Sequence, residues 1–254
     1  MSTGPTPAEA PSEQTSSTPV RRLKAIVKRT PGLNVVALAG IRLLDRFAFR
    51  SSREYWERRY AGGGASGRGS LGLLAEFKAR VLNAFVQEHG VASVTELGCG
   101  DGSQLALARY PRYVGLDISR SALARCRARF ADDATKSFFL YDPDCFIDRA
   151  GIFVSDLALS LDVVYHLVED RVFETYMTHL FGASRRFVIV YSSNADRSSG
   201  DVHIRHRQFD RWIAAEAPEW RLLRHVPNDY PYTGDDRTGS PADFFIYHRS
   251  AVAG

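Results

Sequence analysis

The stretch Val94-Thr-Glu-Leu-Gly-Cys-Gly-Asp-Gly-Ser103 decides how the rest of this 254-residue chain is interpreted. Its first four residues have the composition of a short buried strand, and they run directly into Gly98, Gly100 and Gly102. Glycine allows a tight turn and lets a ligand come close to the backbone. We expect a helix to follow the turn. A strand, a glycine turn and a helix in this order are typical of nucleotide-binding sites in α/β proteins.

Outward from this turn, stretches with the pattern of strands alternate with stretches of helical period. Strands are predicted at 94–97, 113–117, 137–141, 157–163, 187–192, 220–226 and 244–248. Helices are predicted at 74–89, 119–130, 169–181 and 209–217, with Gly90 ending the first and Ser119 capping the second. Seven strands with intervening helices predict an α/β fold with a doubly wound sheet whose two faces are covered.

The residues of the turn exclude two common phosphate-binding patterns. A dinucleotide fingerprint needs a glycine at the sixth place, where this chain has Ser103, and a phosphate loop needs Gly-Lys-Ser or Gly-Lys-Thr. No Lys or Arg stands in the turn, whereas Glu96 and Asp101 make it acidic. This acidity favours a cationic ligand with an amino group and a sulfonium. Asp117, at the end of the next predicted strand, can accept both hydroxyl hydrogens of a ribose.

On these residues the sequence resembles the class I S-adenosylmethionine-dependent methyltransferases, over about residues 55–248. The resemblance implies a seven-stranded Rossmann-like sheet in the order 3-2-1-4-5-7-6 with the last strand antiparallel. It also implies S-adenosyl-L-methionine as the cofactor, with Asp117 at the ribose and Asp142 beside the adenine. The cofactor-binding residues that it implies are Glu96, Gly98, Gly100, Gly102, Asp117, Asp142 and Leu161.

Two candidates for the general base lie in residues 157–166, Leu-Ala-Leu-Ser-Leu-Asp-Val-Val-Tyr-His, which resemble the motif that borders the transferred methyl group in this family. A hydroxyl acceptor needs a proton acceptor, and histidine is the commonest one near neutral pH. Asp162 and His166 are therefore candidate catalytic residues. Structural roles stand beside this interpretation: His166 can bond a backbone carbonyl, and Asp162 can cap the next helix or hold the cofactor.

The other two candidates, His203 and His206, lie in residues 201–207, Asp-Val-His-Ile-Arg-His-Arg. Two His and two Arg in five residues can bind a carboxylate, a phosphate or a sugar. They can equally form a solvated positive edge that leads into the next helix. We expect no metal ion, because magnesium prefers oxygen ligands and this His-x-x-His has no placed carboxylate.

The sequence predicts four parts along the chain. Residues 1–19 are rich in Pro, Ser and Thr and are predicted to be a disordered tail. Residues 20–50 are predicted to form a basic amphipathic helical extension, and 21–50 hold eight Lys or Arg and one Asp. Residues 51–73 are a predicted hinge and Gly-rich loop, interpreted either as a flexible linker or as a loop that closes over a ligand, with Arg68 as a candidate contact. Residues 74–254 form the predicted methyltransferase domain.

Composition limits the remaining interpretations. Apolar residues make up 44% and charged residues 24%, and the three cysteines show no paired spacing. We find neither a transmembrane span nor a signal peptide, and we therefore expect a cytoplasmic protein.

With the family resemblance, we expect an enzyme that methylates oxygen of a sugar or of a secondary or envelope metabolite. Its residues 20–50 could contact a membrane peripherally. One alternative is a nucleic-acid methyltransferase with the basic arm on phosphates, which the lack of an Asn/Asp-Pro-Pro-Tyr motif disfavours. The other is a noncatalytic adaptor. The oligomeric state is left open.

Overall fold

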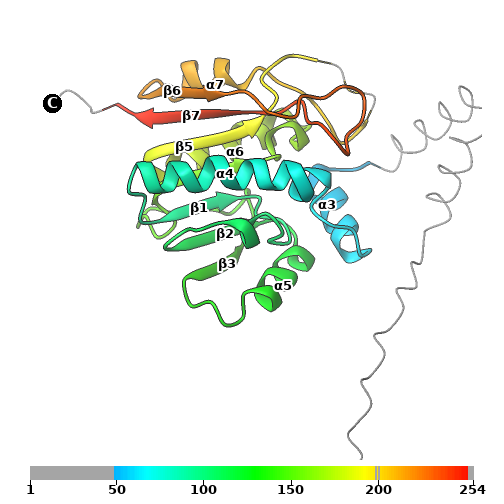
Figure 1. The fold of residues 1–254 in the computed structure, drawn as a ribbon, viewed down its shortest axis with the longest axis horizontal. Coiled ribbons are helices and arrows are strands. Elements are labelled where there is room, and N and C mark those ends of the chain that lie inside the picture. Colours follow the sequence, from blue (N-terminus) through cyan, green and yellow to red (C-terminus); the bar gives the residue numbers. More distant parts are fainter. Residues whose placement is uncertain (1–48, 198, 200, 251–254) are drawn as a thin grey trace, which may run out of the picture. The chain divides into compact units, whose positions relative to one another are not determined.

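A seven-stranded sheet forms the centre of the fold, with its strands in the order β3-β2-β1-β4-β5-β7-β6 (Figure 1). The computed structural model describes residues 49–197, 199 and 201–250. The predicted tail and almost all of the predicted basic extension lie outside the described residues. The strands are β1 Val94–Leu97, β2 Tyr113–Asp117, β3 Lys136–Leu140, β4 Ser155–Leu161, β5 Ser184–Ser192, β6 Trp220–Val226 and β7 Asp243–Arg249.

Strands β1 to β5 all run parallel to one another, whereas β7 runs antiparallel to both β5 and β6. This confirms the strand order that the family resemblance implied, together with its single antiparallel direction. The bounds of β1, β2 and β6 are as predicted, and the other four strands differ from the prediction by up to three residues at an end.

Five α-helices are described, and four of them were predicted as helices of the domain. They are α3 Ser52–Ala61, α4 Gly72–Glu88, α5 Arg120–Arg129, α6 Asp170–Gly182 and α7 Phe209–Glu216. The glycine stop after α4 and the serine cap of α5 are confirmed, and the bounds of the two helices differ from the prediction by one or two residues. Gly90 has a left-handed φ of +56° just past α4, and the Ser119 hydroxyl accepts a hydrogen bond from the Ala122 N–H at 3.1 Å.

The prediction of a helix after the glycine turn is wrong. That segment contains only the 3-10 turn η2, Leu105–Leu107, after which Ala108 is already extended. The reason is the short connection, since β1 ends at Leu97 and β2 begins at Tyr113. Once the turn itself is built, too few residues remain for several helical turns followed by a return to the sheet. The other two 3-10 turns are η1 Arg68–Ser70 and η3 Val164–His166.

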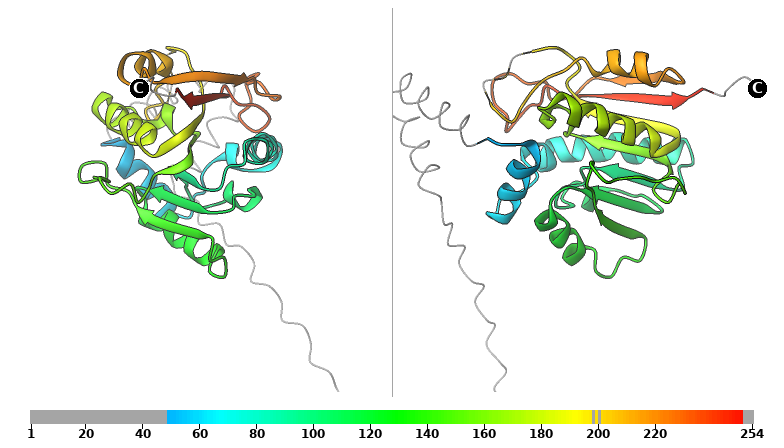
Figure 2. Two further views of the ribbon diagram at one scale, coloured as in Figure 1. Left: turned by 90° about the vertical axis from the view of Figure 1, so that its left-hand side faces the viewer. Right: turned by 180° about the vertical axis from the view of Figure 1, so that it is seen from behind.

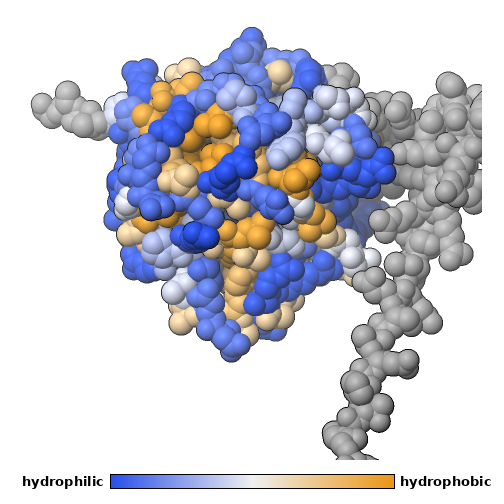
Figure 3. Space-filling view, in the orientation of Figure 1, coloured by the Kyte–Doolittle hydropathy of each residue, from blue (hydrophilic) through white to orange (hydrophobic). Residues whose placement is uncertain are grey.

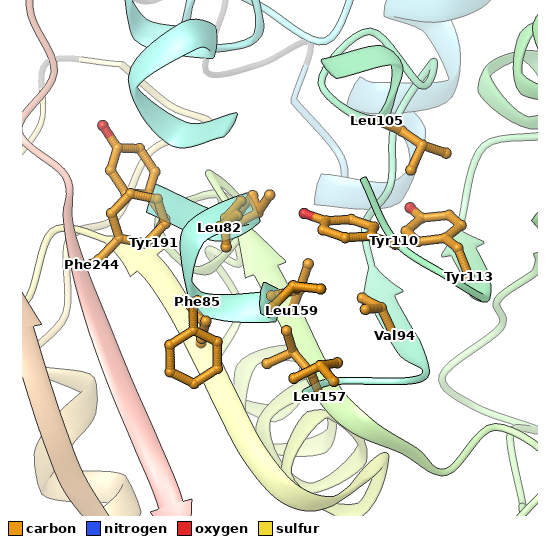
Figure 4. Packing of buried hydrophobic residues seen from close by; sticks show 14 of the residues in the cluster. Leu82, Phe85, Val94, Leu105, Tyr110, Tyr113, Leu157, Leu159, Tyr191 and Phe244 are labelled. Atoms are coloured by element: carbon orange, nitrogen blue, oxygen red, sulfur yellow. The ribbon is translucent and has the colours of Figure 1, made fainter. Parts of the chain in front are cut away.

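Two apolar cores cover the two faces of the sheet, because side chains alternate between the faces along each strand. Along β5, Ile189 and Tyr191 belong to the cluster that includes α4, while Val188 and Val190 belong to the cluster that includes α6. Figure 4 shows residues of the first cluster, including Leu82 and Phe85 of α4. The end-on and rear views show helices on both faces (Figure 2). The predicted doubly wound architecture is thus confirmed.

The face that carries α4 has scattered apolar side chains among hydrophilic ones (Figure 3). Such a mixture is normal for the surface of a folded domain. No helix in the described part of the chain is long and apolar enough to cross a bilayer.

Candidate functional site

The glycine turn follows β1 at the carboxyl edge of the sheet, and all three of its glycines have left-handed backbone angles. The φ angles of Gly98, Gly100 and Gly102 are +80°, +59° and +74°, in a region that other residues rarely adopt. A Cβ atom on Gly98 would lie 2.5 Å from a methyl carbon of Val163, and one on Gly100 would collide with the Ser66 hydroxyl. Glycine is therefore needed at 98 and 100 both for the conformation and for space.

Asp117 ends β2 directly beside the turn. One of its carboxylate oxygens accepts a hydrogen bond from the backbone N–H of Gly100, and the other from that of Ser119, each at 2.8 Å. Burial raises the pKa of Asp117 to about 6, although both backbone hydrogen bonds act in the opposite direction. The residue also lines a pocket at this edge of the sheet. The carboxylate that the family resemblance assigned to a ribose is thus fixed in direction and faces the candidate ligand site.

Glu96 is the second buried acid at this edge. Its carboxyl group accepts a hydrogen bond from the Tyr113 hydroxyl at 2.6 Å. Burial raises the pKa of Glu96 to about 7, and this hydrogen bond and the nearby Lys78 ammonium offset only part of the effect. Both protonation states of Glu96 are consequently populated near neutral pH.

The pocket has about 950 Å³ of empty space, its open mouth included, and lies over the carboxyl ends of β1, β2 and β4. Beside Asp117 its wall is formed by Ile118, Tyr141 and Pro143, which suit a flat ring such as adenine. Asp142, which was expected beside the adenine, does not line the pocket. Its carboxylate pairs with the Arg53 guanidinium, with N···O distances of 3.2 and 2.9 Å.

Leu161 and Asp162 bring the end of β4 to the same pocket. Asp162 has a φ of +59°, an uncommon angle for a residue with a side chain. Its Oδ2 accepts a hydrogen bond from Lys78 Nζ at 2.5 Å, and its Oδ1 accepts one from the Tyr165 hydroxyl at 2.8 Å. Since both oxygens are engaged, this geometry favours an anchoring role for Asp162 over that of a general base.

Lys78 is a pocket residue that the sequence prediction missed. It lies on α4 with only 1% of its side chain exposed, and its ammonium also stands 5.2 Å from the centre of the Tyr191 ring. A signal was present, because residue 78 falls four positions after Leu74 and four before Leu82, on the apolar stripe of the helix. A lysine on that stripe is placed toward the sheet rather than toward solvent.

His166 lines the pocket, and its ring nitrogen Nδ1 lies 3.0 Å from the carbonyl oxygen of His203. A carbonyl can only accept, so Nδ1 carries the proton and Nε2 keeps its lone pair. Burial lowers the pKa of His166 to about 4, and the ring is therefore neutral at pH 7. The Trp56 ring packs edge-on against it at 4.8 Å.

The structure does not bring His203 and His206 to the pocket lining. His203 is stacked between the rings of Tyr55, at 4.3 Å, and His166, at 5.5 Å. His206 Nδ1 lies 2.6 Å from the Ser193 hydroxyl. Through these contacts both histidines pack the loop of residues 201–207 against the rest of the domain.

The two arginines of the same loop, Arg205 and Arg207, are also held within the domain. Both pair with the Asp170 carboxylate, at 3.1 and 2.5 Å, and both donate to the backbone carbonyl of Val168. Both arginines therefore hold the loop against the start of α6. No group of three or more His, Cys, Asp or Glu side chains in the described ranges is arranged to hold a metal ion.

Residues 52–70, here called the strap, form one wall of the pocket. The strap consists of α3, a loop and η1, and Figure 1 shows α3 at the end of the sheet where the parallel strands finish. Its lining residues are Ser52, Arg53, Trp56, Tyr60, Ser66 and Ser70. Between a flexible linker and a loop that closes over a ligand, this geometry favours the loop. Arg68 does not line the pocket and lies 3.6 Å from Asp236 instead.

Hydrogen bonds fasten the strap at both ends. The Ser52 hydroxyl donates to the carbonyl of His166 at 2.8 Å, at the β4 side. The Ser66 hydroxyl donates to Asp101 Oδ1 at 2.9 Å, in the glycine turn. The Arg125 guanidinium bonds the carbonyls of Tyr60 and Gly64, each at 2.6 Å. The spacing of Arg53, Trp56 and Tyr60 along one helix face was the available sequence signal for this wall.

One fully buried polar atom of the lining, Oε1 of Gln104, has no hydrogen-bond partner among the described residues. Gln104 donates from Nε2 to the carbonyl of Ala75 at 3.1 Å, which orients the amide and leaves Oε1 buried and unpaired. A buried unpaired acceptor in a pocket is suited to a donor on a ligand, such as an ammonium group. With the crowded glycines, the Asp117 carboxylate and the apolar wall, the residues present fit S-adenosylmethionine.

No protein-family profile and no curated protein matches the sequence. Solved structures do match the fold. The N-methyltransferase NodS from Bradyrhizobium japonicum, in complex with S-adenosylhomocysteine, superposes with a TM-score of 0.58 at 15% identity, over 79% of this chain and 99% of that one. Magnesium protoporphyrin IX methyltransferase (ChlM) from Synechocystis, with S-adenosylhomocysteine bound, gives 0.53 at 17% identity, over 82% and 99%.

A third match is the methyltransferase domain of the bacterial protein CtHen1, with a TM-score of 0.55 at 22% identity, over 69% of this chain and 98% of that one. What these differently named methyltransferases share with this chain is the architecture. By strand order, by the geometry of its glycine turn and by these superpositions, the chain has the fold of the class I S-adenosylmethionine-dependent methyltransferases.

Proposed function

We propose that this protein transfers a methyl group from S-adenosylmethionine to an oxygen atom of a small molecule. The observation that carries the proposal is the buried Asp117 carboxylate, held beside the left-handed Gly98 and Gly100 in a pocket at the carboxyl ends of the strands. Ligands of open α/β sheets bind at this edge. The acidic residues around the turn suit a cofactor that carries a sulfonium and an ammonium group.

Each lining residue has a task in this proposal. Asp117 accepts the ribose hydroxyls, and the wall that contains Ile118 and Tyr141 packs against the adenine. Gln104 Oε1 accepts from the ammonium group. When bound, S-adenosylmethionine supplies a methyl group on a good leaving group, so that the protein's main work is to align the acceptor and exclude water.

A hydroxyl acceptor must also lose a proton. Of the four histidine and aspartate candidates, His166 is the one that lines the pocket with a free ring lone pair, although its lowered pKa makes it a weak base. We propose Nε2 of His166 as the proton acceptor. The other three are engaged in packing or in hydrogen bonds that anchor the loop after β5 and the end of β4.

The strap supports a small acceptor. It forms a wall of the pocket and is fastened at both ends, which gives a walled pocket with an open mouth rather than the long charged groove that a nucleic acid needs. The basic segment considered for phosphate or membrane binding lies outside the described residues. A sugar or a secondary or envelope metabolite stays the proposed acceptor class.

The test is a transfer assay with methyl-tritiated S-adenosylmethionine and separate acceptor pools of low-molecular-weight extract, RNA and DNA. The proposal expects label in the low-molecular-weight pool, and loss of that label by about tenfold or more in His166→Gln. His206→Gln, which removes a histidine away from the pocket lining, is the matched control and should keep most of the activity. Label in nucleic acid alone would contradict the proposal.

A further inference from the structure

Lys78 is the buried cation of the candidate active site. The other lysine or arginine that lines the pocket, Arg53, lies at the outer wall and is paired with both oxygens of Asp142. Lys78 by contrast is 1% exposed, and its partner Asp162 is 14% exposed. An ion pair withdrawn from water in this way is costly unless the remaining polar groups are also satisfied.

The ammonium of Lys78 has donors left over. It carries three N–H bonds, and in the described structure a single hydrogen bond from Nζ is found, to Asp162 Oδ2 at 2.5 Å. The Tyr191 ring at 5.2 Å offers a favourable face but no lone pair. Each oxygen of Asp162 already accepts one hydrogen bond, from Lys78 and from Tyr165. The N–H bonds of Lys78 that have no acceptor are therefore the donors that this pair offers to a ligand.

The position of the pair separates it from the ribose end of the pocket. Asp117 ends β2 and Asp162 follows β4, with β1 between the two strands. Neighbouring strands lie about 5 Å apart, so the ends of β2 and β4 that carry these residues stand roughly 10 Å apart across the sheet edge. A cofactor anchored at Asp117 thus has its far end near Lys78, where an acceptor must also lie.

We propose that Lys78 binds the acceptor oxygen as it becomes an anion, which narrows the proposed acceptor class to metabolites with a phenol or enol hydroxyl and leaves out simple sugar alcohols. This rests on the proposed methyltransferase function. A positive N–H donor next to the oxygen lowers the pKa of an acidic hydroxyl, whereas an aliphatic alcohol is too weak an acid to gain as much. The Trp56 and His166 rings on the same pocket offer flat surfaces for an unsaturated acceptor.

The transfer balances with the groups named. The hydroxyl proton passes to Nε2 of His166 and later to solvent. The acceptor oxygen forms the new O–C bond to the methyl carbon, while the S–C bond breaks and its electron pair stays on sulfur. The products are the methyl ether and S-adenosylhomocysteine. Lys78 stays protonated throughout and keeps its hydrogen bond to Asp162.

The experiment uses 4-nitrophenol, whose phenolate is yellow and whose phenol is nearly colourless, with the full-length protein saturated with S-adenosylhomocysteine. We expect bound probe to be more ionised than free probe at the same pH. Lys78→Met should abolish that absorbance change and weaken phenolate binding about tenfold, equal to about 1.4 kcal/mol. Binding of 4-nitroanisole, which has no acidic proton, should not depend on Lys78.

Two further variants keep the test decisive if Lys78→Met does not fold. Lys78→Arg keeps the positive charge and should retain the absorbance change. Asp162→Asn leaves the Lys78 ammonium without its counter-charge and should increase the absorbance change of the bound probe. An unchanged spectrum of the probe on the wild type, or no probe binding at all, would overturn the proposal.

The cofactor is measured in parallel by calorimetry. S-Adenosylhomocysteine should bind Lys78→Met within about twofold of the wild type. If Lys78→Met instead loses about tenfold in its affinity for S-adenosylhomocysteine, Lys78 is a cofactor-binding residue and the proposal is overturned. Failure of the wild type to bind S-adenosylhomocysteine would instead be a failure of the methyltransferase assignment, and the two results are thus distinguishable.

Discussion

At the scale of single residues, the edge of the sheet holds two carboxyl groups whose pKa values are raised by burial. Asp117 has a pKa of about 6 and Glu96 one of about 7. They differ in what surrounds them: Asp117 accepts two backbone N–H bonds beside the glycine turn, and Glu96 accepts the Tyr113 hydroxyl. Both residues line the pocket, and Asp117 is the one whose carboxylate is oriented by the backbone of the glycine turn.

Cofactor binding should weaken in acid because of Asp117. Ribose hydroxyls donate to the ionised carboxylate, so binding favours that form, and affinity should fall as the pH drops below about 6, by at most about tenfold per pH unit for one proton. Calorimetry with S-adenosylhomocysteine from pH 5 to 8 measures this. Asp117→Asn should bind more weakly at pH 8 and lose this pH dependence, and an equal slope in that variant would contradict the role of Asp117.

Glu96→Gln should stabilise the protein at alkaline pH. The pKa of Glu96 is raised on folding, from 4.5 to about 7, so its favourable contribution is complete below pH 4.5 and is lost as the pH rises through 7. Glutamine is neutral at all pH values and can still accept from Tyr113. We expect the variant to gain up to about 3 kcal/mol in the free energy of unfolding at pH 8.5 relative to pH 5. Denaturant titrations at the two pH values check this, and equal differences at both would contradict it.

At the scale of elements, regular patterns were predictable and the pocket walls were not. The bounds of β1, β2 and β6 were predicted to the residue, because strand patterns depend on local sequence. The helix after the glycine turn was predicted wrongly, since the 15-residue connection to β2 limits it. Lys78 was missed because an isolated lysine in an amphipathic helix resembles a solvated one. Its partner Asp162 lies 84 positions away in the sequence, and only the fold brings the two together.

The Ser66 hydroxyl lies at the centre of the hydrogen bonds that hold the strap to the glycine turn, and the strap loop should therefore respond to its removal. Ser66 donates to Asp101 and lies 3.0 Å from the Tyr60 hydroxyl. Ser66→Ala removes these bonds, which should cost about 1–2 kcal/mol of local stability and speed the release of S-adenosylhomocysteine in stopped-flow measurements. Ser70→Ala, a second serine of the pocket wall, is the control. Equal release rates in all three proteins would show that the strap does not hold the cofactor.

At the scale of the whole molecule, the sheet joins two cores and positions one pocket at its carboxyl edge. Residues 49–197, 199 and 201–250 contain both apolar clusters, the seven strands of the sheet and the residues that line this pocket. Helix α4 contributes to both the core and the pocket. Its apolar stripe packs on the sheet, and Lys78 on the same stripe lines the pocket. The family resemblance implied this architecture, but the individual partners inside the pocket required the three-dimensional arrangement.

A chain that begins at Phe49 should keep the fold and the cofactor site. All contacts that we assign to the cofactor lie between Ser52 and Tyr176. The affinity of the shortened chain for S-adenosylhomocysteine should lie within about twofold of that of the full-length protein, and its thermal midpoint should be similar. Loss of binding in a folded shortened chain would place an essential part of the site before residue 49.

The most direct test of the account is calorimetric titration of the full-length protein with S-adenosylmethionine and S-adenosylhomocysteine, beside the Asp117→Ala variant. We predict micromolar binding of both ligands to the wild type and a loss of about tenfold or more in the variant, equal to about 1.4 kcal/mol. A folded wild-type protein that binds neither ligand would contradict the assignment of this pocket to the cofactor.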